Sequence, residues 1–318
     1  MSSPAIQPRK NFEATWKSMP ESLRPPELST ADKVGQVAWN VFSVIIPIIG
    51  LARLAAYGIG RLGRYLILPA INRDKIKDGV WTEYFFNPLC KKMCSHFEIT
   101  PYTVTTPDGA KLDATVFKHP KATAQTPTTI YFQGNAAIMH HCGWEWLLRE
   151  SINKNIPQNF IVFDYRSVGL STGEFNVAKD LIIDGSSIAQ LVRQEVQTSA
   201  DKVDFYGVSI GGAIALKTKA ANEILTGKFL SERSLSSFSD VVKAWTVNLH
   251  WILQPIVSLA ISILKNQDLE LDAAADLEKI KGSDFKMRTH FFLQSGLKKY
   301  SVQTPSLILS RFIAGRIK

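Results

Sequence analysis

The chain has 318 residues, of which 45% are hydrophobic, and carries 37 basic against 28 acidic residues for a net charge of +9. This length is enough for one large core with an extension. The chain has three cysteines, Cys90, Cys94 and Cys142, which form no even framework, so a disulfide scaffold is excluded and a reducing compartment is expected.

The basic charge is concentrated at the end of the chain. Residues 279–318 contain nine basic residues and one acidic residue, Asp284, so the rest of the protein is close to neutral. Such a segment attracts anionic lipid or nucleic acid. No recognisable nucleic-acid module accompanies it, so an anionic membrane surface is the favoured partner and no nucleic acid is expected.

Residues 1–33 are polar and rich in proline, which predicts a mobile arm. No apolar run lies near the start, so no signal peptide is expected and the location is predicted as cytoplasmic or membrane-associated.

Residues 34–98 form a predicted apolar helical extension. Its longest uncharged run, 37–52, is interrupted by Pro47 and is shorter than the roughly 20 apolar residues that cross a bilayer. Two interpretations stay open for residues 37–60: contact with a membrane, or an apolar helix packed on the main domain.

From residue 99 onward, the sequence alternates predicted strands and helices. The predicted strands are 99–106, 112–118, 128–132, 159–165 and 202–206, and the predicted helices follow residues 144 and 177. Pro107-Asp108-Gly109 is a turn signal between the first two strands. This order predicts an α/β domain over 99–318, with a mostly parallel sheet and helices on both faces.

The stretch 244–264 has 21 residues without a formal charge, bracketed by Lys243 and Lys265. Its length could span a bilayer. It contains His250, Gln254 and Pro255, however, so helices of a lid over the sheet, within about 238–280, are the favoured interpretation.

Gly207-Val208-Ser209-Ile210-Gly211 follows a predicted strand and opens a predicted helix. In this context the pattern indicates a nucleophile elbow, a sharp turn that exposes a serine beyond the sheet edge. The amide of Ile210 and the loop Gln133-Gly134-Asn135-Ala136 are then candidate donors to an oxyanion. An ordinary glycine-rich turn between a strand and a helix is the alternative.

Three stretches between residues 99 and 240 resemble the α/β-hydrolase superfamily: Tyr131-Phe-Gln-Gly-Asn-Ala136, Phe163-Asp-Tyr-Arg-Ser-Val-Gly-Leu-Ser-Thr-Gly173 and Gly207-Val-Ser-Ile-Gly-Gly212. Gln133 before Gly-Asn, the apolar N-terminal segment and Arg233-Ser-Leu-Ser-Ser-Phe-Ser239 are similar to the CHLPS-type hydrolase-like family of chlamydiae and Legionella. The narrower resemblance would imply delivery to a host cell.

The wider resemblance implies a serine hydrolase acting on an acyl ester or lipid without a metal or cofactor. Its pattern makes Ser209 the nucleophile, Ile210 and the Gly134/Asn135 loop the oxyanion hole, and Gly207 and Gly211 the elbow glycines. Gln133 supports the loop. Asp164 and Arg166 are expected to brace the neighbouring loops through an ion pair.

The sequence departs from the family in its last part, where an acid and a histidine should follow. The loop 295–300, after the predicted strand 285–294, has no carboxylate, and no histidine follows His290. His290 is therefore the candidate base, and His250, His140 and His141 are the other candidates.

Residues 285–318 contain no acidic residue, which suggests that the hydrolase frame is truncated or shifted there. Two functions stay open: an active serine hydrolase, or a catalytically impaired hydrolase fold acting as an interaction or membrane-associated protein.

Overall fold

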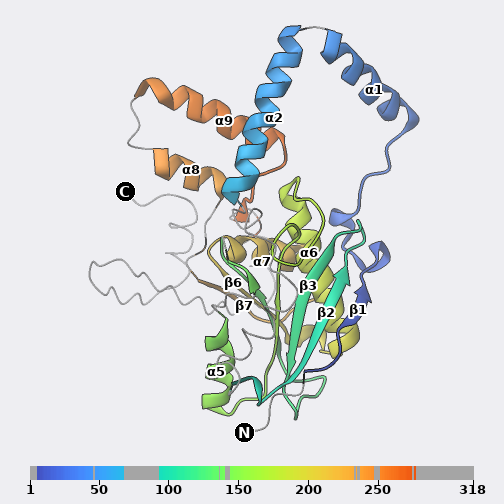
Figure 1. Ribbon diagram of the computed structural model, residues 1–318, viewed down its shortest axis with the longest axis vertical. Helices are drawn as coiled ribbons and strands as arrows, with labels where there is room; N and C mark the ends of the chain where they lie inside the picture. Colours follow the sequence, from blue (N-terminus) through green and yellow to red (C-terminus); the bar gives the residue numbers. More distant parts are fainter. Residues whose placement is uncertain are drawn as a thin grey trace.

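A mixed β-sheet forms the centre of the computed structural model, which describes residues 6–45, 47–67, 93–135, 137–139, 144–232, 234, 237–246, 251–273 and 276 (Figure 1). Its seven strands are β1 (Lys10–Glu13), β2 (Glu98–Thr105), β3 (Lys111–Lys118), β4 (Thr128–Phe132), β5 (Asn159–Phe163), β6 (Val203–Val208) and β7 (Phe229–Glu232). Their order across the sheet is β1-β2-β3-β5-β4-β6-β7. The α/β prediction is confirmed.

The parallel part of the sheet consists of β5, β4, β6 and β7, whereas β3 pairs antiparallel with both β2 and β5. The predicted turn joins β2 to β3, and Gly109 has a φ of 92° there, a conformation that glycine adopts without steric cost. The parallel strands place their carboxyl ends at one edge, where sites of open α/β sheets are usually found.

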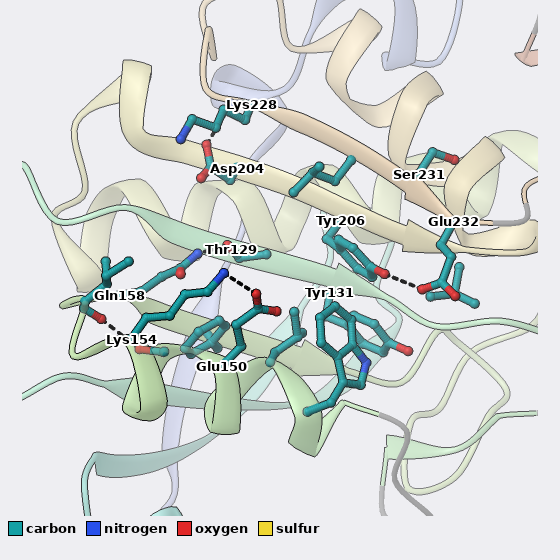
Figure 2. A pocket seen from close by; sticks show the side chains of 17 residues that line it. Thr129, Tyr131, Glu150, Lys154, Gln158, Asp204, Tyr206, Lys228, Ser231 and Glu232 are labelled. Carbon is teal, nitrogen blue, oxygen red and sulfur yellow. Dashed lines mark hydrogen bonds and ion pairs between the residues drawn. The ribbon is translucent and has the colours of Figure 1, made fainter. Parts of the chain in front are cut away.

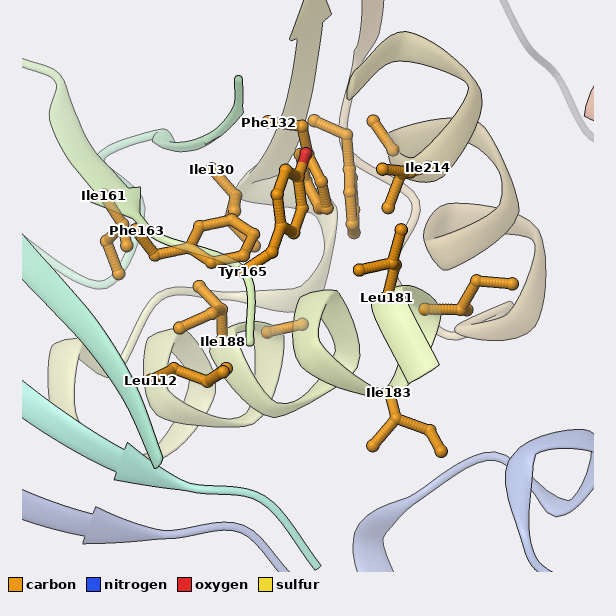
Figure 3. Packing of buried hydrophobic residues seen from close by; sticks show 14 of the residues in the cluster. Leu112, Ile130, Phe132, Ile161, Phe163, Tyr165, Leu181, Ile183, Ile188 and Ile214 are labelled. Atoms are coloured by element: carbon orange, nitrogen blue, oxygen red, sulfur yellow. The ribbon is translucent and has the colours of Figure 1, made fainter. Parts of the chain in front are cut away.

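Helices cover both faces of the sheet, as predicted. Helix α5 (Glu145–Lys154) packs on one face, and α6 (Ala178–Leu191) and α7 (Ile210–Ala221) pack on the other. Because side chains alternate along a strand, Phe132 of β4 faces α6 and α7 while Tyr131 faces α5. Figure 3 shows the larger core, in which side chains of the strands meet those of α6 and α7. Short helical turns occur at Trp16–Ser18, Glu21–Leu23, Val192–Val196, Ala200–Lys202 and Trp251–Leu253.

The predicted mobile arm is wrong for the residues that pack on the domain. Strand β1 pairs in parallel with β2 along its length, and Arg9 forms a 2.6 Å ion pair with the buried Asp113. Phe12, Met19 and Leu23 are buried in the core. An edge strand is held by backbone pairing and needs few apolar side chains. Phe12, Met19 and Leu23 are far apart in the sequence, so they form no periodic hydrophobic pattern that would predict a strand or helix.

Two pairs of helices extend beyond the sheet. Helices α1 (Thr30–Ile45) and α2 (Pro47–Ile67) come before the domain, and α8 (Phe238–Thr246) and α9 (Gln254–Asn266) follow β7. Figure 1 shows α1 and α2 reaching away from the sheet, with α9 beside α2. Both apolar stretches are thus divided into shorter helices, and within the described ranges none has the length and hydropathy to cross a bilayer.

Candidate active site

Ser209 occupies a sharp turn between β6 and α7. Its backbone has φ 55° and ψ −125°, a conformation that is costly for any residue except glycine. The Ser209 N–H donates to the carbonyl of Glu232 at 2.9 Å, which fixes the turn to the end of β7. Helix α7 begins at the next residue, so the Ile210 N–H has no acceptor within its own helix.

Gly207 and Gly211 have no room for a side chain. A Cβ at Gly207 would clash with the backbone of Gly211 and Gly212, and one at Gly211 would clash with the carbonyl oxygens of Phe132 and Gln133. The spacing of the two glycines is therefore a steric requirement of this turn, since the strand and helix backbones meet here.

The loop after β4 lies directly against the serine. A Cβ at Gly134 would lie 3.5 Å from the Ser209 Cβ and 3.4 Å from the carbonyl oxygen of Val208. Gly134 is half-buried and Asn135 is exposed, while Ala136 lies outside the described residues. Gly134 is thus next to the Ser209 turn.

Asp164 holds both ends of this loop. Its Oδ1 accepts hydrogen bonds from Gln133 Nε2 at 2.6 Å and from the Met139 N–H at 2.7 Å. Gln133 Nε2 also donates to the carbonyl of Phe163, and the Tyr165 hydroxyl donates to the carbonyl of Gln133. The loop between Gln133 and Met139 is therefore fixed to the end of β5.

The Asp164 side chain is completely buried, and burial raises its pKa to about 8 even though the bonds from Met139 and Gln133 favour the charged form. Its Oδ2 has no hydrogen-bond partner in the described part of the chain. This oxygen lies beside Gly169, where a Cβ would clash with it. The environment favours a neutral carboxyl group at neutral pH.

Arg166 braces the loops, but its partners are not the predicted one. Its guanidinium contacts Asp184 at 2.7 Å and Asp108 at 2.7 Å, and its backbone N–H donates to Asp184 at 2.9 Å. The expected ion pair with Asp164 is wrong, because Arg166 is directed to α6 and the β2–β3 turn while Asp164 is directed to the loop after β4.

The charge of Arg166 acts on both carboxylates. Burial raises the pKa of Asp184 to about 6, against the opposing effect of Arg166. Burial also acts to raise the pKa of Asp108, but the hydrogen bonds from Arg166 and Thr106, together with the charge of Arg166, outweigh it and the pKa is lowered. Arg166 therefore links three segments that surround the carboxyl edge of the sheet.

The remaining motif residues after β5 are structural. Ser171 accepts the Asp113 N–H at 2.8 Å and donates to the carbonyl of Asp164 at 2.9 Å. Gly169 and Gly173 have positive φ values of 57° and 97°. The 163–173 motif, one of the three that resemble the α/β-hydrolase superfamily, thus determines the shape of the loop after β5.

A separate groove of about 970 Å³ lies on the α5 face of the sheet (Figure 2). Tyr131 and Tyr206 stack on its floor, and the Tyr206 hydroxyl donates to Glu232 at 2.6 Å. Burial raises the pKa of Asp204 to about 6, at the other end of the groove. Val208, Ser231 and Glu232 line the end nearest to the turn, but Ser209 is not part of the lining.

The candidate bases His140, His141, His250 and His290 lie outside the described residues, as do the predicted strand 285–294 and the basic residues 279–318. Within the described ranges, no group of three His, Cys, Asp or Glu side chains could hold a metal ion.

The sheet order, the parallel strands β5, β4, β6 and β7, and the turn at Ser209 together define the architecture. The chain has the α/β-hydrolase fold.

Comparison with known proteins finds distant similarities. No family profile matches the chain. A relative, protein bem46 of Schizosaccharomyces pombe, is 26% identical over 213 residues, which cover 65% of this chain and 67% of the yeast protein. Esterase Pf2001 of Pyrococcus furiosus has 16% identity and a TM-score of 0.43, over 61% of this chain and 69% of its own. Acetyl xylan esterase of Paenibacillus sp. R4 has 12% identity and a TM-score of 0.40, over 77% of this chain and 96% of its own.

Proposed function

We propose that the protein is a serine hydrolase that cleaves acyl esters, with Ser209 as its nucleophile. The observation that carries this proposal is the strained backbone of Ser209 at the end of β6, held by Glu232 and by two glycines that tolerate no Cβ. Strain of this kind persists where the surroundings impose it, and it is concentrated at functional sites.

The surroundings of Ser209 suit acyl transfer. The Ser209 Oγ would attack the carbonyl carbon of the ester and lose its proton to a base, with the C–O bond of the leaving alcohol breaking as that alcohol takes up the proton. Water would then attack the acyl-serine and release the acid. The described residues that support the oxyanion step are Ile210, whose N–H lies at the first turn of α7, and the backbone of Gly134 and Asn135.

A histidine is the usual base for this chemistry, and His290 is the candidate from the sequence. Membership of the narrower CHLPS-type family stays a prediction. Fluorescent or chromogenic short-chain esters are the first substrates for assay, because they require little of an acyl pocket.

Ester turnover by the wild type and two serine variants tests the proposal. Ser209→Ala should lose turnover by several orders of magnitude, since the acyl-enzyme cannot form. Ser231→Ala is the matched control: this serine lies in the adjacent strand β7, close to its carboxyl end, and bonds to Ser234. Turnover that survives in Ser209→Ala, or no turnover by the folded wild type on any ester tested, would refute it.

A further inference from the structure

Asp164 holds the chain on both sides of Gly134, the residue that lies against the Ser209 turn. Gln133 directly precedes Gly134, and its Nε2 donates to Asp164 Oδ1 at 2.6 Å. Met139 follows Gly134 in the same loop, and its N–H donates to the same oxygen at 2.7 Å. One carboxyl oxygen at the end of β5 therefore controls where this part of the loop after β4 lies.

Further bonds connect Gln133 and Met139 to their surroundings. Gln133 Nε2 also donates to the carbonyl of Phe163 at 2.8 Å, so both hydrogens of its amide group are used at the end of β5. The Trp144 ring N–H donates to the carbonyl of Met139 at 2.8 Å. Asp164 is the side chain to which both Gln133 and Met139 donate, so it connects the two parts of this network.

Gly169 makes room for the Asp164 carboxyl group. A Cβ at residue 169 would lie 2.2 Å from Asp164 Oδ2 and 3.1 Å from a methyl carbon of Ile138, which belongs to the loop after β4. Gly169 also has a φ of 57°, a conformation that other residues rarely adopt. The glycine of the 163–173 motif thus allows the carboxyl group to pack against that loop.

The surroundings of Asp164 disfavour a charge. Its side chain is completely buried, and no positively charged group among the described residues forms an ion pair with it. Arg166 is directed to Asp184 and Asp108 instead. Burial, with a smaller effect from the negative charge of Asp113 on β3, raises the pKa of Asp164 to about 8. A buried carboxylate without a cation is costly, so the neutral acid is the form that holds the loop.

We propose that Asp164 is a positioning residue for catalysis at Ser209: as an uncharged carboxyl group, it keeps the backbone of Gly134 beside the nucleophile, where the oxyanion forms. This inference rests on the proposed esterase function. Asp164 acts through the loop, because its bonds go to Gln133 and Met139. Misplacing a catalytic group by about 1 Å can cost about 100-fold in rate, so a modest shift of this loop is enough to impair turnover.

Loss of the Asp164 proton should release the loop. A charge at this buried position favours structures in which water reaches the carboxylate. The loop after β4 carries the exposed Asn135, so its local opening admits water without unfolding the sheet. Turnover should therefore fall as the pH rises past the Asp164 pKa of about 8.

Steady-state kinetics on a short-chain ester tests the proposal. Asp164→Ala removes the acceptor and should lower kcat by about 10- to 100-fold with KM changed less than about threefold, because the oxyanion forms in the transition state. Asp164→Asn keeps an uncharged oxygen acceptor and should retain kcat at pH 7 within about threefold. Gln133→Met removes one donor and leaves the acid, so it should lower kcat about tenfold even if Asp164→Ala does not fold.

The pH profile separates an uncharged positioning group from a general effect on the fold. Between pH 8 and pH 9, kcat of the wild type should fall about tenfold relative to Asp164→Asn, which has no proton to lose there. The catalytic base titrates in both proteins, so it does not produce this difference. Asp201→Ala, which removes an exposed aspartate, is the matched control and should have the wild-type kcat and profile.

Hydrogen exchange measures the loop without catalysis. At pH 7, amides of the loop after β4, including the Met139 N–H, should exchange at least about tenfold faster in Asp164→Ala than in the wild type, relative to amides of β4. Asp164→Asn should exchange like the wild type. If the folded wild type hydrolyses no ester, the esterase proposal fails, and this measurement alone decides whether Asp164 holds the loop.

Four results overturn the inference. One is equal kcat for Asp164→Ala and the wild type, and another is a loss in Asp164→Asn as large as that in Asp164→Ala. The third is the same alkaline profile for the wild type and Asp164→Asn. The fourth is equal exchange of the loop amides in Asp164→Ala and the wild type, whether or not the protein is an esterase.

Discussion

The neutral state of Asp164 predicts a specific pH dependence of stability, which Asp164→Asn should remove. Burial raises the pKa of Asp164 to about 8 in the folded protein, whereas an aspartate in the unfolded chain has a pKa near the ordinary value of 3.8. Between these values the folded state binds the extra proton, so stability is greatest below the unfolded pKa and falls as pH rises toward the folded one.

The size of this effect follows from the slope of about 1.4 kcal/mol per pH unit for one proton. Between pH 5 and pH 7 the wild type should lose about 3 kcal/mol of unfolding free energy relative to Asp164→Asn. The asparagine keeps an oxygen for Gln133 and Met139. A change in unfolding free energy that the amide causes equally at every pH does not affect the test, because only the change in unfolding free energy between pH 5 and pH 7 is compared.

Urea unfolding of both proteins at pH 5, 6 and 7 measures the difference. Asp201→Asn, which removes an exposed carboxylate, should retain the wild-type profile. A difference between the wild type and Asp164→Asn that stays constant within about 0.5 kcal/mol would refute the neutral carboxyl group.

Three further substitutions test the packing around the site. Gly211→Ala should destabilise the fold by about 3 kcal/mol or more, because its Cβ would clash with the Phe132 carbonyl oxygen. The control is Gly58→Ala, whose Cβ would meet nothing within 4 Å, so the melting temperature should stay unchanged or rise slightly. Equal melting temperatures of the two variants would contradict the steric argument. Arg166→Gln should lower the free energy of unfolding in urea by about 3–5 kcal/mol, because Asp184 stays buried without its charged partner. The control is Arg149→Gln, which changes an exposed arginine and should cost less than about 1 kcal/mol. An equally small loss for Arg166→Gln would contradict its role in holding the loops. Phe12→Ala should cost about 3–5 kcal/mol if the arm is part of the core, and an unchanged melting temperature would restore the mobile arm.

The sequence predicted the elements whose signals are local. Strand β4 was found from a short apolar run, and the Ser209 turn from two glycines at fixed spacing, because each signal lies within a few neighbouring residues. The partners of Arg166 are 58 and 18 residues away, so nothing near it in the chain reveals them. Its closeness to Asp164 in the sequence suggested the wrong pair.

The sequence also missed features that depend on three-dimensional placement. Met139 and Tyr165 help hold the loop after β4 through a backbone N–H and a hydroxyl group. Met139 belongs to no pattern recognised in the sequence, and Tyr165 lies in the 163–173 motif but was given no role there. The apolar segment 37–60 gave an open choice between packing and membrane contact. The structure shows that α2 packs on α9 with one face, whereas its Leu51, Leu54 and Leu62 are exposed.

Labelling with a fluorophosphonate, followed by peptide mass spectrometry, tests the central claim most directly. The probe reacts with a serine whose hydroxyl is activated as a nucleophile. We predict one adduct on the folded wild type, located on Ser209, and no adduct on Ser209→Ala. An adduct on another serine, or none on folded wild type under conditions that label a control esterase, would contradict the assignment of Ser209 as the nucleophile.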